Sequence, residues 1–292
     1  MTPDAPSLDL LVAGNLTIDR FPDGSSAPGG SVLHIARAAA PRGLRVGIVT
    51  NAGPEPEARA GLDELHRAAA IVESSPQPAT TSFRHGETAE GRQLWLGRRG
   101  ESLGSGADAR ERIDTRAVLY APVAGEVPAE ALAAWDAGWV RGAILQGWLR
   151  TTDEGEEVRP LRLSALSGAV TRALRGFDLL VASREDLLAE GPEPEQQLRS
   201  MRRTFGRRPV LVVTDGPNGA WIGLAPSLVD GEPWHLPVPW RVDDVPTVGS
   251  GDVLAAFMLV GEWHRPPDRS FVRRQITEAM RVVAEMLEQR RA

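Results

Sequence analysis

The 292-residue chain contains no cysteine and no lysine, so all 33 of its basic residues are arginine. Without cysteine, the protein has no disulfides, thiolate metal sites or cysteine nucleophiles. Without lysine, it has neither a Walker-type phosphate loop, which requires that residue, nor Schiff-base chemistry. A side-chain cation that clamps a phosphate group must therefore be an arginine, whose planar guanidinium suits bidentate contact.

The chain also lacks long hydrophobic runs and an excess of positive charge. Its most apolar segments, residues 9–13 and 254–260, are far too short to span a bilayer. The net charge of -6 argues against unspecific binding to nucleic acid or to a membrane surface. The first residues show no basic start typical of a signal peptide. We therefore expect a cytoplasmic protein that has neither nucleic acid nor membrane as a partner.

The histidines do not indicate a metal centre. They lie at His34, His66, His85, His235 and His264. No two of them have a ligand-like spacing such as His-x-x-x-His, so a dedicated zinc site is not expected.

Short apolar runs alternate with amphipathic segments along most of the chain. Strands are expected at residues 8–14, 44–50, 117–121, 143–146, 177–182, 210–214 and 219–224. Helices are expected at residues 31–40, 58–70, 128–137, 161–174, 195–205 and 271–290, with loops at 53–57 and 191–195. This order predicts parallel βαβ units in an α/β domain. The length and the 42% hydrophobic content suit one large domain with a sizeable core.

Residues 71–99 interrupt the alternation. Two strand-like runs, residues 80–84 and 93–97, flank a polar turn at residues 85–91. This pattern predicts an antiparallel hairpin that projects from the main sheet.

The motif Gly249-Ser250-Gly251-Asp252 directly precedes an apolar helical segment. The first amides of a helix have no partner within the helix, and the helix dipole there favours an anion. Glycine lets an anion approach the bare backbone. Asp252 would repel that anion unless it accepts the proton of an attacking hydroxyl while the amides hold the transferring group. An ordinary N-capping aspartate is the alternative interpretation.

Polar residues follow several predicted strands, at the sheet edge where α/β proteins bind ligands. Asn15 and Asp19 follow the first strand, and Gly29-Gly30 precede the first helix. Thr214-Asp215-Gly216-Pro217-Asn218-Gly219 follows a later strand and is either a plain turn or a nucleotide contact. Arg150 also lies at this edge, as a ligand-binding cation or as a solvated surface residue. Taken singly, Asn15, Asp19 and the Gly29-Gly30 pair are more often cap or turn residues than ligand contacts.

In this order the motifs resemble the ribokinase (PfkB-type) carbohydrate kinase family, through an early Gly-Gly pair and a late Gly-x-Gly-Asp that opens a helix. The segment Gln146-Gly147-Trp148-Leu149-Arg150 is most similar to inositol-kinase-like members. The resemblance implies a three-layer αβα sandwich with a mostly parallel central sheet and a small β lid. We expect residues 1–292 to form this single domain, with a lid hairpin at about 80–98 and a short segment at 15–28. Only about ten residues separate Asp19 from Gly29, too few for the first pair of lid strands usual in the family.

The resemblance also implies roles for individual residues. Asp252 would be the base, and the amides of Gly249, Ser250, Gly251 and Asp252 the anion hole. Substrate would contact Asn15, Asp19, Gly29, Gly30, His34 and Arg150. The nucleotide would contact Ser183, Asp186, Thr214, Gly216 and Gly219. ATP and Mg²⁺ would be the cofactors, with no side chain as a direct metal ligand and Asp186 acting through water.

Three positions differ from the family pattern. Pro246-Thr247-Val248 replaces Asp-Thr-Thr, His34 replaces an Asn, and Ser183-Arg184-Glu185-Asp186 replaces Asn-x-x-Glu. The leading hypothesis is an ATP-dependent kinase, monomeric or homodimeric, that acts on a small sugar, a cyclitol or a related polyol. The alternative is a catalytically impaired relative that binds a nucleotide or sugar as a sensor. A Rossmann oxidoreductase is poorly supported, because no Gly-x-Gly-x-x-Gly follows the first strand.

Overall fold

The computed structural model describes residues 7–88, 91–104, 113–133, 139–224, 232–263 and 266–291. Their largest element is a nine-stranded sheet in the order β15-β14-β13-β12-β11-β10-β2-β5-β6. Its strands are β2 (Leu10–Ala13), β5 (Val46–Ala52), β6 (Ile71–Pro76), β10 (Ala117–Tyr120), β11 (Val140–Ile144), β12 (Leu179–Ser183), β13 (Val210–Thr214), β14 (Ala220–Gly223) and β15 (Trp234–Leu236). Pairing is parallel from β6 to β13 and antiparallel at β14 and β15. The short strands β1 (Ser7–Leu8) and β9 (Asp114–Thr115) pair separately.

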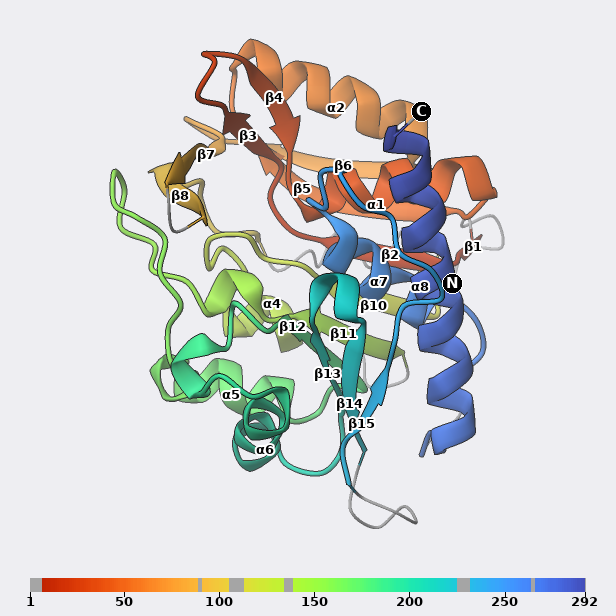
Figure 1. The fold of residues 1–292 in the computed structure, drawn as a ribbon. Coiled ribbons are helices and arrows are strands. Elements are labelled where there is room, and N and C mark those ends of the chain that lie inside the picture. Colours follow the sequence, from red (N-terminus) through yellow and green to blue (C-terminus); the bar gives the residue numbers. More distant parts are fainter. Residues whose placement is uncertain are drawn as a thin grey trace.

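Helices cover both faces of this sheet, which explains why its strands are apolar on both sides (Figure 1). In β2, Leu10 and Val12 belong to one core cluster, whereas Leu11 and Ala13 belong to the other. The first cluster includes residues of α1 (Ser31–Ala39), α2 (Pro56–Ala68), α7 (Ser250–Leu259) and α8 (Arg269–Arg291). The second includes residues of α4 (Ala129–Ala133), α5 (Gly168–Leu174) and α6 (Pro194–Phe205). The predicted three-layer α/β architecture is confirmed.

A separate four-stranded sheet forms the lid, in the order β4-β3-β7-β8. The predicted hairpin is present as β7 (Thr81–Thr88) and β8 (Gly91–Arg98), which are antiparallel. The expectation that the segment after Asp19 is too short for a strand pair is wrong. β3 (Thr17–Arg20) and β4 (Ser26–Gly29) pair through a tight turn, in which the amide of Phe21 donates to the Ser25 carbonyl over 2.9 Å. β3 also pairs in parallel with β7, so both segments form one lid.

Several predicted boundaries are wrong for local reasons. Of the helix expected at 161–174, only α5 forms, because Ser167 caps it by accepting from the amide of Val170. Before it lies only the 3-10 turn η3 (Leu163–Ala165). The segment at 53–57 is not entirely loop, since Pro56 occupies the first turn of α2, and Pro194 does the same in α6. Residues 134–137 of the helix expected at 128–137 lie outside the described residues.

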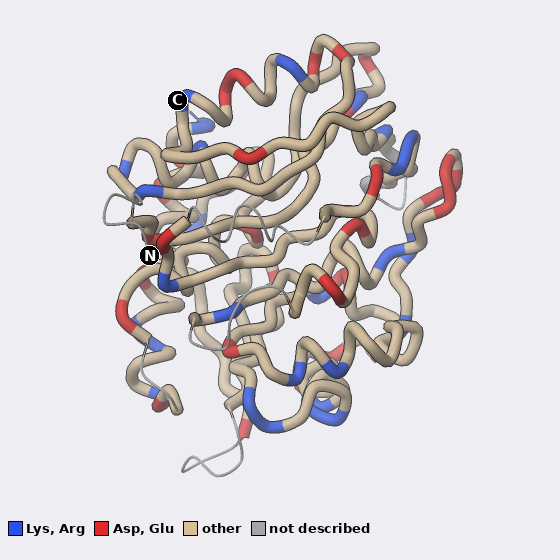
Figure 2. The backbone as a smooth tube through the Cα atoms, turned by 180° about the vertical axis from the view of Figure 1, so that it is seen from behind, with Lys and Arg blue, Asp and Glu red and all other residues tan. Residues whose placement is uncertain are grey.

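Strands β6 and β15, at the two edges of the sheet, were not predicted. The remaining short elements are the 3-10 turns η1 (Ala40–Arg42), η2 (Gln146–Trp148), η4 (Leu188–Glu190) and η5 (Gly216–Asn218). Each helix in the described part of the chain is too short or too polar to cross a membrane. Acidic and basic residues are interspersed along the chain (Figure 2).

Candidate active site

Helix α7 begins at the predicted motif, with Gly249 as its N-cap in the left-handed conformation (φ 81°). The amide of Ser250 donates to the Thr247 carbonyl over 3.1 Å, so one of the four expected amides is already bonded within the protein. Within the described part of the chain, the amides of Gly249, Gly251 and Asp252 have no protein acceptor. At Gly251, a β-carbon would meet no atom within 4 Å, so the backbone there is open to a ligand. Three amides at a helix N-terminus therefore remain for an anion.

Asp252 is only 9% exposed and lines a cavity of about 500 Å³ beneath the lid, which we call the lid cavity. Its carboxylate accepts a 2.9 Å hydrogen bond from the hydroxyl of Ser31 in α1. This bond is not a helix cap, because its donor lies on another helix. Burial raises the pKa of Asp252, and the nearby His34, Ser31 and Arg150 oppose that rise only in part. The carboxylate is thus a stronger base than an exposed aspartate.

The lid cavity is formed by the carboxyl ends of the central strands, by α1 and α7, and by the lid. Its lining residues are Thr17, Asp19, Gly30, Ser31, His34, Phe83, His85, Leu94, Val123, Gln146, Arg150, Ser183, Glu185, Thr247, Val248, Gly249 and Asp252. On the lid side, Asp19 lies 3.3 Å from Nε2 of His85, whose ring stacks on Phe21 at 5.1 Å. Gly29 does not line the cavity, but a β-carbon at Gly29 would collide with the Asp19 carboxylate. Gly30 does line the lid cavity, and its backbone φ is 94°.

Arg150 brings a positive charge to this cavity. Its guanidinium lies 3.3 Å from Asp186, which is 5% exposed and also accepts from the amide and hydroxyl of Ser183. Asp186 does not itself line the cavity; the neighbouring Glu185 does. With its amide oxygen turned toward Arg150, Gln146 accepts from the same guanidinium. Asp186 and Gln146 therefore hold Arg150 in place.

His34 and Asn15 differ in how far they can serve a ligand. His34 lines the cavity, and burial lowers its pKa although Asp252 and Asp19 act in the opposite direction. Its Nδ1 has no partner among the described residues. Asn15 is fully buried, and its side-chain amide donates to the Glu101 carbonyl over 3.0 Å. The structure does not bring Asn15 to the wall of the lid cavity.

A second cavity, of about 290 Å³, lies between α7, α8 and the segment after β15; we call it the α8 cavity. Thr214, Gly216 and Gly219 line it on one side, and Ser250 and Gly251 on another. The remaining wall is largely apolar and consists mainly of Val238, Trp240, Val242, Val245, Leu254, Met280, Val283, Ala284 and Leu287. Thr247 lines both cavities, so they meet at the N-terminus of α7.

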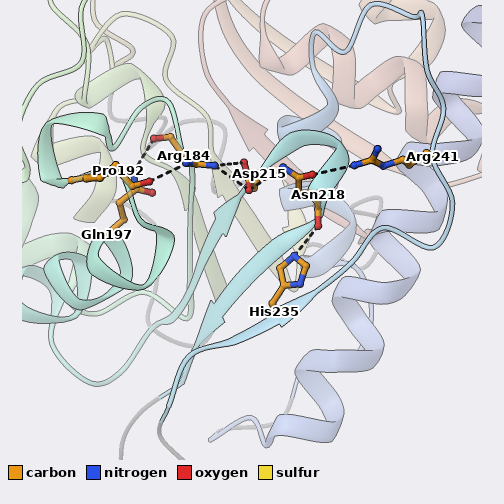
Figure 3. Close-up of polar contacts among 8 residues, drawn as sticks. Arg184, Pro192, Gln197, Asp215, Asn218, His235 and Arg241 are labelled. Carbon is orange, nitrogen blue, oxygen red and sulfur yellow. Dashed lines mark hydrogen bonds and ion pairs between the residues drawn. The ribbon is translucent and has the colours of Figure 1, made fainter.

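Polar contacts hold the turn that closes the α8 cavity (Figure 3). Arg184 pairs with Asp215 at 3.3 Å, and Arg241 donates to the Asn218 side chain over 3.1 Å. The carbonyl of Asn218 lies 2.7 Å from Nε2 of His235 in β15. The turn is therefore tied to β12, to β15 and to the segment beyond it.

The described residues include no group of three or more histidine, aspartate or glutamate side chains placed to hold a metal ion. His264 lies outside these residues.

Comparison with known proteins shows the fold. No family model and no curated protein sequence matches the chain. The structure resembles a pyrophosphate-dependent kinase in the ribokinase family, solved as a sulfate complex, with a TM-score of 0.71 and 19% identity over 96% of this chain and 95% of that one. It also resembles a pyrophosphate-dependent kinase in the ribokinase family complexed with a pyrophosphate analog and myo-inositol. That match has a TM-score of 0.67 and 21% identity and covers 94% of this chain and 92% of that one. Ribokinase from Thermotoga maritima matches with a TM-score of 0.64 and 13% identity, over 96% of this chain and 93% of that one. The chain has the ribokinase fold.

Within this ribokinase fold, the predicted site residues divide into three groups. The lid cavity gathers Asp19, Gly30, His34, Arg150, Ser183, Gly249 and Asp252, and the α8 cavity gathers Thr214, Gly216, Gly219, Ser250 and Gly251. Asn15, Gly29 and Asp186 support these walls from behind. Sequence reasoning missed Ser31, His85 and Glu185. Of these, Ser31 could have been found from its place directly after the Gly-Gly pair.

Proposed function

We propose that this chain is a kinase of the ribokinase family that transfers the terminal phosphoryl group of ATP to a hydroxyl of a sugar, cyclitol or related polyol. One observation supports this most strongly. The buried carboxylate of Asp252 lies beside three amides that have no acceptor among the described residues, where a polar cavity meets an apolar one. A proton acceptor and an anion site at one helix end are what phosphoryl transfer to an alcohol requires.

In the proposed reaction the acceptor lies in the lid cavity, where Asp19 and Thr17 offer oxygens to its hydroxyl groups. Asp252 takes the proton of the attacking hydroxyl. That oxygen forms a bond to the terminal phosphorus as the bond to ADP breaks. The amides of Gly249, Gly251 and Asp252 stabilise the charge on the transferring group, and Arg150 is the side-chain cation beside it.

Mg²⁺ would enter the site bound to the phosphate oxygens of ATP and would partly neutralise their negative charge. Glu185, on the cavity wall, and Asp186, behind it, are the acids that would bind its water ligands. The substitution of Ser183 for the family's Asn leaves this shell with hydroxyl rather than amide groups.

The α8 cavity favours a nucleotide over pyrophosphate as the donor. Two of the structural neighbours are pyrophosphate-dependent kinases. Pyrophosphate has no group for an apolar wall, whereas an adenine ring would cover Val242, Met280 and Leu287 and lie near Trp240, which is 37% exposed. The lid cavity, of about 500 Å³, has room for a monosaccharide or cyclitol, and one neighbour binds myo-inositol. We further propose a cytoplasmic monomer or homodimer.

The test is a coupled assay of phosphoryl transfer with Mg²⁺, using ATP or pyrophosphate against sugars, myo-inositol and nucleosides. We expect turnover with ATP and at least one polyol. Turnover with pyrophosphate alone would overturn the nucleotide assignment. Binding of ATP or a polyol, seen as a raised unfolding temperature but without turnover on any acceptor, would favour the sensor instead.

A further inference from the structure

Near the end of the chain, Arg290 of α8 reaches the segment that leads into the anion site. Its Nη1 donates to the carbonyls of Pro246 and Val248, each over 2.8 Å. Figure 1 shows the C-terminal end of α8 beside α1. Arg42 of η1, which directly follows α1, pairs with Glu285 of α8. One guanidinium nitrogen therefore binds two carbonyls that are only two residues apart.

Among the described residues, the guanidinium of Arg290 contacts backbone carbonyls rather than a carboxylate. Across the ranges that the structure describes, no carboxylate lies within ion-pair distance of its guanidinium. Its other contact is a 3.6 Å approach of Nη2 to the sulfur of Met286. Arg37, its cationic neighbour, pairs with Glu64 at 2.6 Å instead. Burial and the nearby Arg37 both lower the pKa of Arg290, yet a guanidinium stays charged throughout the physiological range.

The peptide group links this contact to the site. The carbonyl of Val248 and the amide N–H of Gly249 belong to one planar unit and point in opposite directions. A cation that fixes the Val248 carbonyl thus also fixes the direction of the Gly249 N–H. It polarises that N–H as well, because hydrogen bonds in a chain strengthen one another. The field of Arg290 also reaches His34, where it helps to lower the pKa of the ring.

We propose that Arg290 is a positioning residue for the anion site. Its guanidinium is a tethered cation that holds the Pro246 and Val248 carbonyls and keeps the Gly249 amide aimed at the phosphate. This inference rests on the proposed function for its effect on catalysis, but not for its effect on anion binding. Converging backbone carbonyls are also the ligands of monovalent cations, so a free cation is expected to replace the missing side chain in part.

The experiment compares Arg290→Met and Arg290→Lys with a matched control, Arg42→Met. Arg42 also anchors α8, through Glu285 and the Ala38 carbonyl, but does not contact residues 246–249. The readouts are tripolyphosphate affinity by calorimetry, kcat and KM, and the unfolding midpoint. Loss of a charged hydrogen-bonding group should weaken tripolyphosphate binding and lower kcat about tenfold in Arg290→Met, with a smaller change in acceptor KM. Arg290→Lys and Arg42→Met should stay close to the wild type in tripolyphosphate affinity and in kcat.

A free cation should restore part of the lost tripolyphosphate affinity and kcat in Arg290→Met only. The cation is added as guanidinium chloride or potassium chloride in the low millimolar range, and tetramethylammonium chloride at the same concentration is the control. Unchanged tripolyphosphate affinity in Arg290→Met would overturn the inference, as would an equal loss in Arg42→Met. If Arg290→Met does not fold, Arg290→Gln is read by the same criteria. A wild-type protein that binds tripolyphosphate without phosphoryl transfer would refute the proposed function alone, and Arg290 would then be judged on binding.

Discussion

Asp252 has one hydrogen bond from a side chain, donated by Ser31, and lies in a wall that also contains His34 and Arg150. Burial disfavours its charged form, whereas these neighbours favour that form. The result is a carboxylate that holds a proton more strongly than usual but still has partners when it is ionised. An acid used only to cap its helix would not need a hydroxyl donor from α1.

Replacing Asp252 by Asn should abolish turnover while leaving the fold and ATP binding nearly intact. Removal of a general base lowers kcat by about 10²–10⁴-fold. Steady-state kinetics and nucleotide calorimetry measure the two effects. Ser31→Ala is the control, because it removes only the hydrogen bond to the base and should cost far less. Full activity in Asp252→Asn would exclude this residue from the mechanism.

At the scale of the element, the first turn of α7 depends on two glycines for different reasons. Gly249 has φ at 81°, and a β-carbon there would collide with the His34 ring. Gly251 has no positive φ, and a β-carbon there would meet nothing within 4 Å of protein. Gly249 is therefore required by the fold, whereas the fold itself does not require a glycine at position 251.

Gly251→Ala and Gly249→Ala should accordingly separate stability from donor binding. Gly251→Ala should keep or raise the unfolding free energy, by up to about 1 kcal/mol, because alanine favours the helix. Its methyl group, at the wall of the α8 cavity, should nevertheless raise the KM for ATP. Gly249→Ala should destabilise the protein by about 1–3 kcal/mol through backbone strain and collision. Urea unfolding and donor kinetics measure both variants; equal donor KM in Gly251→Ala and the wild type would contradict the proposed anion approach.

At the scale of the whole molecule, the site makes the stability of the fold depend on pH. Because the folded-state pKa of Asp252 is raised, its protonated form fits the fold without penalty below the unfolded pKa of about 3.8. As pH rises through the folded pKa, ionisation of the buried acid progressively costs stability. The ionised form of Asp252, which the proposed reaction requires, is therefore disfavoured by the fold.

Urea unfolding of the wild type and Asp252→Asn between pH 4 and pH 8 tests this linkage. Asparagine carries no charge, so the stability of Asp252→Asn relative to the wild type should be lowest at pH 4 and should increase as pH rises. A difference that stays constant across this range would show that burial does not shift the pKa of Asp252.

Particular elements show why sequence reasoning succeeded or failed. The parallel βαβ units followed from apolar runs that alternate with amphipathic segments, which is a local pattern, whereas the three-layer sandwich was implied by the family resemblance. β6 was missed because Ile71–Pro76 contains only two strong apolar residues. This segment forms a strand through its pairing with β5, which its own sequence does not indicate. The β3–β4 pair was missed because a five-residue turn allows shorter strands than the family resemblance suggested.

The sequence alone determined the exclusions and the chemistry of the motif. It has no lysine or cysteine, and it places an acid and two glycines at the start of an apolar helix. Only the tertiary structure decided which amides stay free, because Ser250 donates to Thr247 across a turn that no local pattern predicts. It also placed Ser31 and Arg290, 221 residues before Asp252 and 38 after it, on either side of one helix end. Residues so distant in the chain meet because burying one face of the sheet packs α1, α7 and α8 together, a consequence of the whole core rather than of any segment.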